Sequence, residues 1–163
     1  MSIDEYFDLD DDDDFRLFAK RLQELANKVI EMNLNETPVP SAINIHNDVR
    51  DTLALWAKSH NYSCVVEKGV KYLSLNNKTN IVREEYGLID LVIGDIPIEI
   101  DSSYRRKSID KLLSYDSLRA IWLYAESEKL NDKISKINCK KEIAFLPISP
   151  YKTLSRNRHK CLE

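Results

Sequence analysis

The segment GLIDLVIGDIPIEID, residues 87 to 101, decides the fold of this chain. Gly94 and Asp95 separate two strand patterns, and glycine at the first position of a two-residue loop is what a type II′ β-hairpin requires. Such a loop fixes the register of the two strands, so that Asp90 lies opposite Glu99. We therefore predict an antiparallel hairpin over these residues.

The two faces of this hairpin differ in character because side chains alternate between the faces of a sheet. The aliphatic face must be core and consists of Ile89, Leu91, Ile93, Ile96, Ile98 and Ile100. The opposite face carries Asp90, Glu99 and Asp101, and directly opposed residues lie only about 4.5–5.5 Å apart at Cβ. A divalent cation would offset the repulsion between these carboxylates. The alternative is a half-exposed hairpin whose acidic face is relieved by nearby Lys or Arg.

The chemistry of the acidic face favours a hard cation such as Mg²⁺ or Mn²⁺, which prefers carboxylate, carbonyl, water and phosphate oxygens. A zinc site has little support, because the cysteines and histidines are scattered and share no ligand spacing. They are Cys64, Cys139, Cys161, His46, His60 and His159.

The rest of the chain predicts the α/β class, with a mixed β-sheet flanked by helices. Helices are expected over residues 15–34, 47–58, 108–117 and 127–137, and strands over residues 62–67, 70–75, 87–93, 96–101, 119–125 and 142–148. Ser108 is the expected N-cap of the third helix. Because the last strands follow helical crossovers, we expect them to be parallel.

Length and charge divide the chain into three parts. The 163 residues suit one α/β domain over residues 15–150, between an acidic, disordered tail (1–14) and a basic tail (151–163). The first fourteen residues carry eight acidic side chains and no basic one, which leaves 24 basic against 19 acidic residues in the remainder. A positive body suits a polyanion such as DNA.

Several classes of protein are excluded by what the sequence lacks. No stretch of about 18 apolar residues could span a bilayer, so we expect no membrane contact. The N-terminus lacks the basic start and apolar core of an export signal, and a cytoplasmic location is expected. No glycine-rich phosphate loop or Ser–His–Asp constellation can be assigned.

The motif order resembles the PD-(D/E)XK nuclease superfamily over about residues 46 to 125. The resemblance rests on G-x-I-D at residues 87–90, an aliphatic strand, a short turn, I-E-I-D at residues 98–101 and S-x-x-K-L at residues 108–112. It implies a restriction-endonuclease-like core that binds Mg²⁺ or Mn²⁺ and hydrolyses DNA phosphodiester bonds. By resemblance Asp90 and Glu99 are the metal ligands, together with the backbone carbonyl of Ile100.

The chain departs from the family pattern at Asp101, where Lys is usual. Some members are similar in carrying Glu-x-Asp, with a basic residue supplied by the next turn or helix. Lys111 is the favoured candidate because from the first turn of the helix it could lean over the strand ends, and Lys107 and Arg105 are alternatives. The same side chains could equally form an ordinary charged helix face.

The family also places an acidic residue on an early helix. Asp48 or Asp51 could fill this role, Glu67 is a further acidic neighbour, and either Asp could instead be a simple helix-start residue. Phosphate contacts are expected from a set of basic residues, namely Arg105, Arg106, Lys107, Arg156 and Arg158.

Two functions of different class follow. The first is a metal-dependent endonuclease acting on DNA, which the Asp90 and Glu99 pair favours. The second is a catalytically inactive protein of this fold that binds nucleic acid or a protein partner, for example in defence or counter-defence, which Asp101 favours. A third and weaker hypothesis is that the acidic N-terminus mimics nucleic acid. The sequence leaves open whether the chain forms a homodimer.

Overall fold

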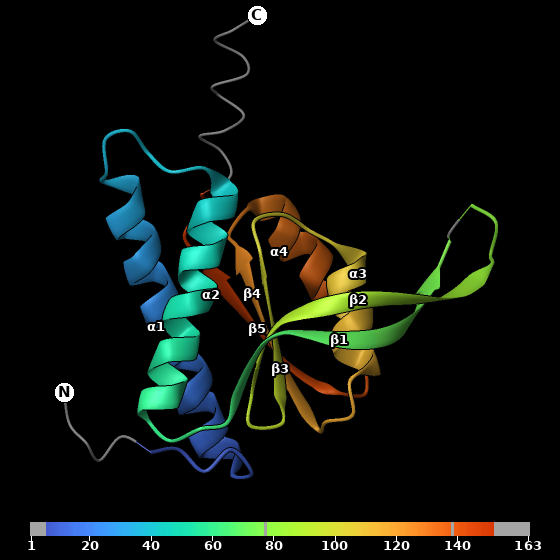
Figure 1. Ribbon diagram of the computed structural model, residues 1–163. Helices are drawn as coiled ribbons and strands as arrows, with labels where there is room; N and C mark the ends of the chain where they lie inside the picture. Colours follow the sequence, from blue (N-terminus) through green and yellow to red (C-terminus); the bar gives the residue numbers. More distant parts are fainter. Residues whose placement is uncertain (1–5, 77, 138, 152–163) are drawn as a thin grey trace, which may run out of the picture.

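The computed structural model describes residues 6–76, 78–137 and 139–151, which form five strands and four helices (Figure 1). The helices are α1 (Asp12–Leu34), α2 (Ala42–Ser59), α3 (Arg106–Ser114) and α4 (Glu128–Ser135). The strands are β1 (Cys64–Leu75), β2 (Val82–Ile93), β3 (Ile96–Asp101), β4 (Arg119–Ala125) and β5 (Glu142–Ile148). They form one mixed sheet in the order β1-β2-β3-β4-β5, antiparallel from β1 to β3 and parallel from β3 to β5. The predicted α/β class and parallel last strands are confirmed.

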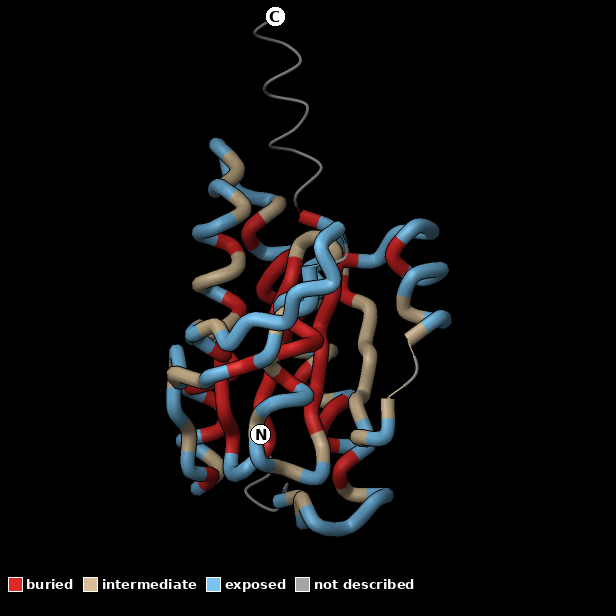
Figure 2. The backbone as a smooth tube through the Cα atoms, turned by 90° about the vertical axis from the view of Figure 1, so that its right-hand side faces the viewer, coloured by how far each residue is buried: buried red, intermediate tan, exposed pale blue. Residues whose placement is uncertain are grey.

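The sheet is covered on both faces, and its central strands are the most deeply buried part of the chain (Figure 2). Helices α1 and α2 pack with the aliphatic side of the hairpin into one apolar core. Helices α3 and α4 form a smaller core on the other face with Trp122 and Tyr124. None of the described helices is long and apolar enough to cross a membrane.

The predicted hairpin is confirmed in its loop, its register and its buried face. Gly94 has a φ of 60°, the left-handed conformation that favours glycine, and Ile93 pairs with Ile96. All six aliphatic residues of the predicted core face are at most 2% exposed. The hairpin therefore follows from the local pattern alone.

Two predicted strands, 62–67 and 70–75, are instead parts of the single strand β1. They join because β1 pairs along its length with the equally long β2. Near the far end of this pair, β1 and β2 extend beyond the other strands as a two-stranded arm (Figure 1). Pairing of β2 with β3 covers only three residue pairs, the last of which is Leu91 with Ile98. The strands therefore diverge at Asp90, and the predicted direct opposition of Asp90 and Glu99 is not part of the ladder.

The structure differs from the predicted disordered tail at the acidic N-terminal segment, part of which is helical. Helix α1 begins at Asp12, and the side chain of Asp11 caps it by accepting a hydrogen bond from the Asp14 amide. Arg119 contacts this segment through the Leu9 carbonyl and the Asp12 carboxylate. The predicted disordered tail over residues 1–14 therefore needs correction for residues 6–14, because carboxylates at a helix N-terminus are favoured by the helix dipole. Residues 1–5 lie outside the described part of the chain.

Candidate functional site

A cavity of about 440 Å³ lies where β2 diverges from β3. Helix α2 supplies one wall, α3 supplies another, and the chain after β5 closes a third side. Its main polar side chains are those of His46, Asp90, Glu99, Asp101, Lys111 and Tyr151. The geometry thus brings the three predicted carboxylates into one cavity.

Asp90 is held by contacts from two directions. Its Oδ2 accepts a hydrogen bond of 2.8 Å from the backbone amide of Ile100. Its Oδ1 lies 3.3 Å from Nε2 of His46. The carboxyl groups of Asp90 and Glu99 are also close enough to hydrogen-bond each other. The two carboxyl groups therefore meet through their side chains rather than through the backbone ladder.

The proximity of these carboxyl groups separates their pKa values. Burial, followed by the charge of Asp90, raises the pKa of Glu99 well above its ordinary value. Burial acts in the same direction on Asp90, but hydrogen bonds with His46 and Glu99 outweigh it and hold the pKa of Asp90 below its ordinary value. Without a bound cation, burial and the charge of Asp90 thus favour the protonated form of Glu99, whereas the hydrogen bonds favour the ionised form of Asp90.

Lys111 contacts the diverging strands, although α3 begins at Arg106 and so places it in the last turn of the helix and not in the predicted first turn. Its Nζ is 2.5 Å from Oε1 of Glu99 and donates a hydrogen bond of 2.8 Å to the carbonyl of Leu88. A Cβ at Gly87 would lie 3.1 Å from the Tyr72 ring, which is a tight contact, and 3.4 Å from the Lys111 Cδ, which is an ordinary van der Waals distance. The ammonium is thus placed against Glu99.

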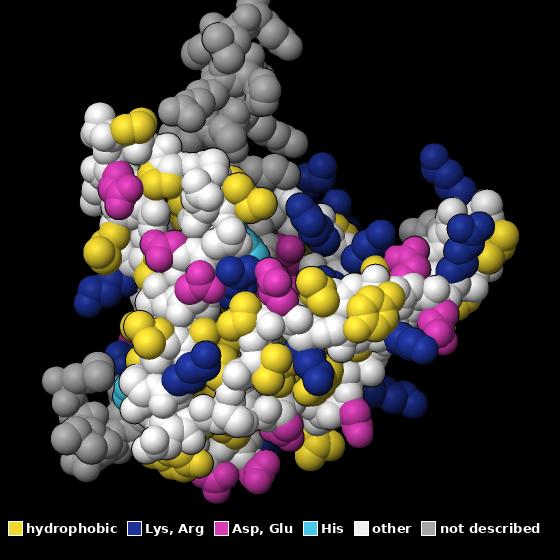
Figure 3. Space-filling view, in the orientation of Figure 1, with side chains coloured by type: hydrophobic (Ala, Val, Ile, Leu, Met, Phe, Trp, Pro, Cys, Tyr) yellow, Lys and Arg dark blue, Asp and Glu magenta, His cyan; other side chains and the backbone are white. Residues whose placement is uncertain are grey.

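Lys107 and Arg105 also line the cavity but are directed to other carboxylates. Lys107 Nζ lies 3.5 Å from Oε2 of Glu85, and Arg105 Nε lies 4.0 Å from Oδ1 of Asp101. Arg106 faces away and pairs with Asp110. Figure 3 shows Lys and Arg side chains gathered in the hollow between α2 and the arm. The remaining predicted phosphate contacts, Arg156 and Arg158, lie outside the described residues.

Asp101, which stands where the family usually has Lys, is occupied by structural contacts. It accepts a hydrogen bond of 2.6 Å from the indole Nε1 of Trp122 and another from the hydroxyl of Ser108. Burial raises the pKa of Asp101, and these two hydrogen bonds oppose that rise. Ser108 is consequently not the N-cap that the sequence predicts, because α3 begins at Arg106 with Arg105 as its N-cap.

His46 is a site residue that the sequence analysis considered only for zinc. Helix α2 begins at Ala42, five residues earlier than predicted, and so includes His46. Its pKa is raised from the ordinary value, chiefly by the hydrogen bond to Asp90. A signal for this placement exists, because His46 continues the helical stripe of Val49 and Leu53 at spacings of three and four.

The predicted early-helix acids lie outside the cavity. Asp48 accepts a hydrogen bond of 2.7 Å from Asn33 of α1. Asp51 and Glu67 both pair with Arg50, at 3.0 and 2.9 Å. Their positions follow from the helix period, since His46 occupies the face of α2 that approaches Asp90 and the two aspartates lie on other faces. In this structure α2 contributes an imidazole to the site instead of a carboxylate.

Two buried side-chain oxygens lack a hydrogen-bond partner among the described residues, and both belong to residues that line this cavity. They are Oε1 of Glu99, which the Lys111 ammonium approaches without hydrogen-bond geometry, and the hydroxyl of Tyr151. Tyr151 was assigned to the basic tail, whereas it is buried against the domain. Burial, then the charge of Asp101, raises its pKa, so the hydroxyl remains a donor.

Because Glu99 Oε1 is ion-paired with Lys111, the Tyr151 hydroxyl is the atom of the two that a polar ligand would supply with a partner. Within the described residues, no group of three or more His, Cys, Asp or Glu side chains is arranged to hold a metal ion. The oxygen donors in the cavity are instead the pair Asp90 and Glu99 beside the backbone of Ile100. No protein-family model matches the sequence, and no curated protein or solved structure matches it significantly.

Proposed function

We propose that this chain is a Mg²⁺- or Mn²⁺-dependent nuclease that hydrolyses phosphodiester bonds in DNA, with a restriction-endonuclease-like core. One observation carries the proposal: the half-buried Asp90, the buried Glu99 and the Tyr151 hydroxyl, which has no hydrogen-bond partner among the described residues, line a single cavity that is also lined by basic side chains. Such a cavity has oxygen ligands for a cation and donors for the phosphate that a cation would bring.

The residues present fit a divalent cation on chemical grounds. Asp90 and Glu99 would hold it, with the carbonyl of Ile100 as a further oxygen donor. Burial, followed by the charge of Asp90, raises the pKa of Glu99, and the Lys111 ammonium opposes that rise; a bound cation would act in the same direction as Lys111. A bound divalent cation supplies charge that polarises a phosphate oxygen and lowers the pKa of a coordinated water.

The surrounding side chains have separate tasks in this proposal. His46 orients Asp90 through its hydrogen bond, in the way that outer partners fix metal-binding carboxylates. Lys111 brings a positive charge beside Glu99, where it would offset the negative charge that develops on phosphorus. Arg105 and Lys107 would bind flanking phosphates at the mouth of the cavity.

A second candidate function is binding without catalysis. It is favoured by the contacts of Asp101, which is occupied by Trp122 and Ser108 where the family usually supplies a catalytic Lys. In that case the same cavity would bind nucleic acid or an acidic protein surface without cleaving it.

Plasmid cleavage separates the two candidates. Purified protein is incubated with supercoiled plasmid and Mg²⁺ or Mn²⁺, beside the variants Asp90→Asn, Glu99→Gln and Asp51→Asn. The nuclease proposal predicts that the wild type and Asp51→Asn, whose carboxylate lies outside the cavity, nick or linearise the plasmid. It predicts that the cleavage rate of Asp90→Asn and Glu99→Gln falls by at least about 100-fold. Cleavage that survives both cavity substitutions, or no cleavage by the wild type, contradicts the nuclease.

A further inference from the structure

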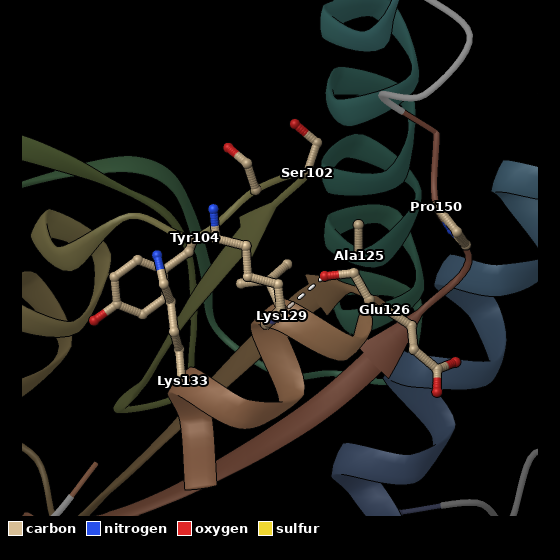
Figure 4. Close-up of a pocket in the computed structure, with 10 residues that line it drawn as sticks. Ser102, Tyr104, Ala125, Glu126, Lys129, Lys133 and Pro150 are labelled. Atoms are coloured by element: carbon tan, nitrogen blue, oxygen red, sulfur yellow. Dashed lines mark hydrogen bonds between the residues drawn. The ribbon is translucent and has the colours of Figure 1, made fainter. Parts of the chain in front are cut away.

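A second cavity, of about 340 Å³, lies beside the carboxyl ends of the parallel strands β3 and β4 (Figure 4). The loop after β3 and the first turns of α4 form its walls. Its polar lining residues are Ser102, Ser103, Tyr104, Glu126, Ser127, Lys129 and Lys133. We call it the Lys129–Lys133 pocket. In open α/β sheets, the crevice outside the carboxyl ends of parallel strands is a common position for ligands.

The two lysines, both exposed, outnumber the one acidic lining residue, Glu126, so the formal charge of the pocket lining is positive. They are four residues apart on α4, so they share one face of the helix, and both side chains extend toward the loop that carries Tyr104 (Figure 4). The Lys133 ammonium lies 4.7 Å from the centre of the Tyr104 ring. Neither lysine pairs with a carboxylate among the described residues, and the carboxylate of Glu126 points away from them (Figure 4). Like charges at this spacing repel each other weakly, and a bound anion would offset the repulsion.

The remaining polar groups of the pocket are also suited to an anion. The hydroxyls of Ser102 and Ser103 form no hydrogen bond within the described residues. Ser127 caps α4 by accepting a hydrogen bond from the amide of Leu130, which leaves the first amides of the helix free to donate. Hydroxyls, ammonium groups and helix-end amides together match the oxygens of a phosphate group.

The pocket borders the candidate active site at one shared residue. Ser102 lines both cavities and directly follows Asp101 at the end of β3. An extended polyanion seated at Asp90 and Glu99 would therefore reach the lysines by passing Ser102. A free phosphate group would need only the pocket itself.

We infer that the Lys129–Lys133 pocket binds a backbone phosphate of the same nucleic-acid strand whose scissile bond lies in the Asp90–Glu99 cavity. The inference rests on the proposed function, because only a nuclease would have a scissile strand in the neighbouring cavity. The pocket would hold the strand on one side of the scissile bond, so it would contribute to affinity and to the choice of cleavage position.

The test measures binding apart from cleavage. A fluorescein-labelled 12-nucleotide DNA is titrated with full-length protein in EDTA at several salt concentrations, with the wild type, Lys129→Gln/Lys133→Gln and Lys20→Gln/Lys28→Gln. The last variant removes the same charge from exposed positions on α1. We expect the pocket variant to bind the DNA about tenfold more weakly than the wild type. The slope of log affinity against log salt concentration should also become shallower by about the amount that one or two phosphate contacts contribute. The α1 variant should change the affinity less than twofold.

Equal losses in the two double variants, or no loss in either, would overturn the inference. A second experiment uses NMR to follow the amide resonances of residues 127–133 during titration with inorganic phosphate and, separately, with the oligonucleotide. Shifts with the oligonucleotide support the strand assignment, whereas shifts with inorganic phosphate alone overturn it. Plasmid cleavage is measured separately. If the wild type does not cleave but the pocket variant alone loses DNA affinity, the nuclease proposal is contradicted and phosphate binding by the pocket is still supported.

Discussion

Asp90 on β2 accepts a hydrogen bond from the backbone amide of Ile100 on β3, beyond the point where the two strands stop pairing. A regular ladder would use that amide to bond the backbone of β2. Here a side chain takes it instead, so the strands separate while Asp90 stays fixed beside Glu99. The divergence creates the cavity, and the same hydrogen bond orients the carboxylate that we propose as a metal ligand.

Metal affinity should increase with pH. Binding requires Glu99 as a carboxylate, and its pKa is raised well above the ordinary value. We expect the Mg²⁺ or Mn²⁺ dissociation constant to rise by about tenfold per pH unit below the pKa of Glu99. Isothermal titration calorimetry between about pH 5.5 and pH 8 measures this. An affinity that is independent of pH would show that Glu99 is not a ligand, and Glu99→Gln should remove binding at every pH.

The metal-free protein should lose stability as the pH rises through neutrality. The pKa of His46 is raised in the folded state, so its contribution is fully present below about 6.5 and is lost as the pH rises through the folded value. Glu99 acts in the same direction, because its folded pKa is also raised. Urea unfolding at a series of pH values should show this decline, and His46→Gln should flatten it. An unchanged slope in the variant would contradict the contact between His46 and Asp90.

Asp101 should contribute more to the stability of the fold than to metal binding. Replacing it with Ala leaves the Trp122 indole and the Ser108 hydroxyl without their buried acceptor, which we expect to lower the free energy of unfolding by about 1–3 kcal/mol. Denaturant unfolding measures the loss, and the Mg²⁺-induced rise in melting temperature should persist. A variant of normal stability that no longer responds to Mg²⁺ would instead make Asp101 a ligand.

Substitutions of Lys111 and Lys107 should affect different steps, the cleavage rate and the DNA affinity respectively. Lys111 touches Glu99, so Lys111→Gln should reduce the cleavage rate about 100-fold with little change in DNA affinity. Lys107 lies at the cavity beside Glu85, so Lys107→Gln should reduce affinity a few-fold and leave the rate at saturating DNA nearly unchanged. Single-turnover kinetics with each variant separate the two effects. If Lys107→Gln caused the larger rate loss, the assignment of Lys111 would be wrong.

The parts of the fold that could be predicted are those set by local pattern. The hairpin follows from Gly94 and the alternation around it, and the buried face follows from the isoleucines. The end of the β2–β3 pairing at Leu91 and Ile98 could not be predicted, because it depends on the Asp90 side chain taking the place of a backbone group of β2.

The candidate site was predicted only in part, for a related reason. Asp90 and Glu99 meet because the hairpin joins them, whereas His46 and Tyr151 arrive from distant segments whose position depends on tertiary packing. The helix period indicates that His46 faces the sheet, but no pattern indicates that Tyr151 folds back. The ordered start at Asp12 was missed because charge density alone suggested disorder, although carboxylates are also favoured at a helix N-terminus.

The most direct test of the account is a crystal structure of the protein with Mn²⁺, using the anomalous scattering of the ion to locate it. We predict one peak about 2.0–2.4 Å from a carboxylate oxygen of both Asp90 and Glu99, with Lys111 displaced from its close approach to Oε1 of Glu99. A crystal at saturating Mn²⁺ with no ion between these two residues, and with Lys111 still against Glu99, would contradict the proposed metal site.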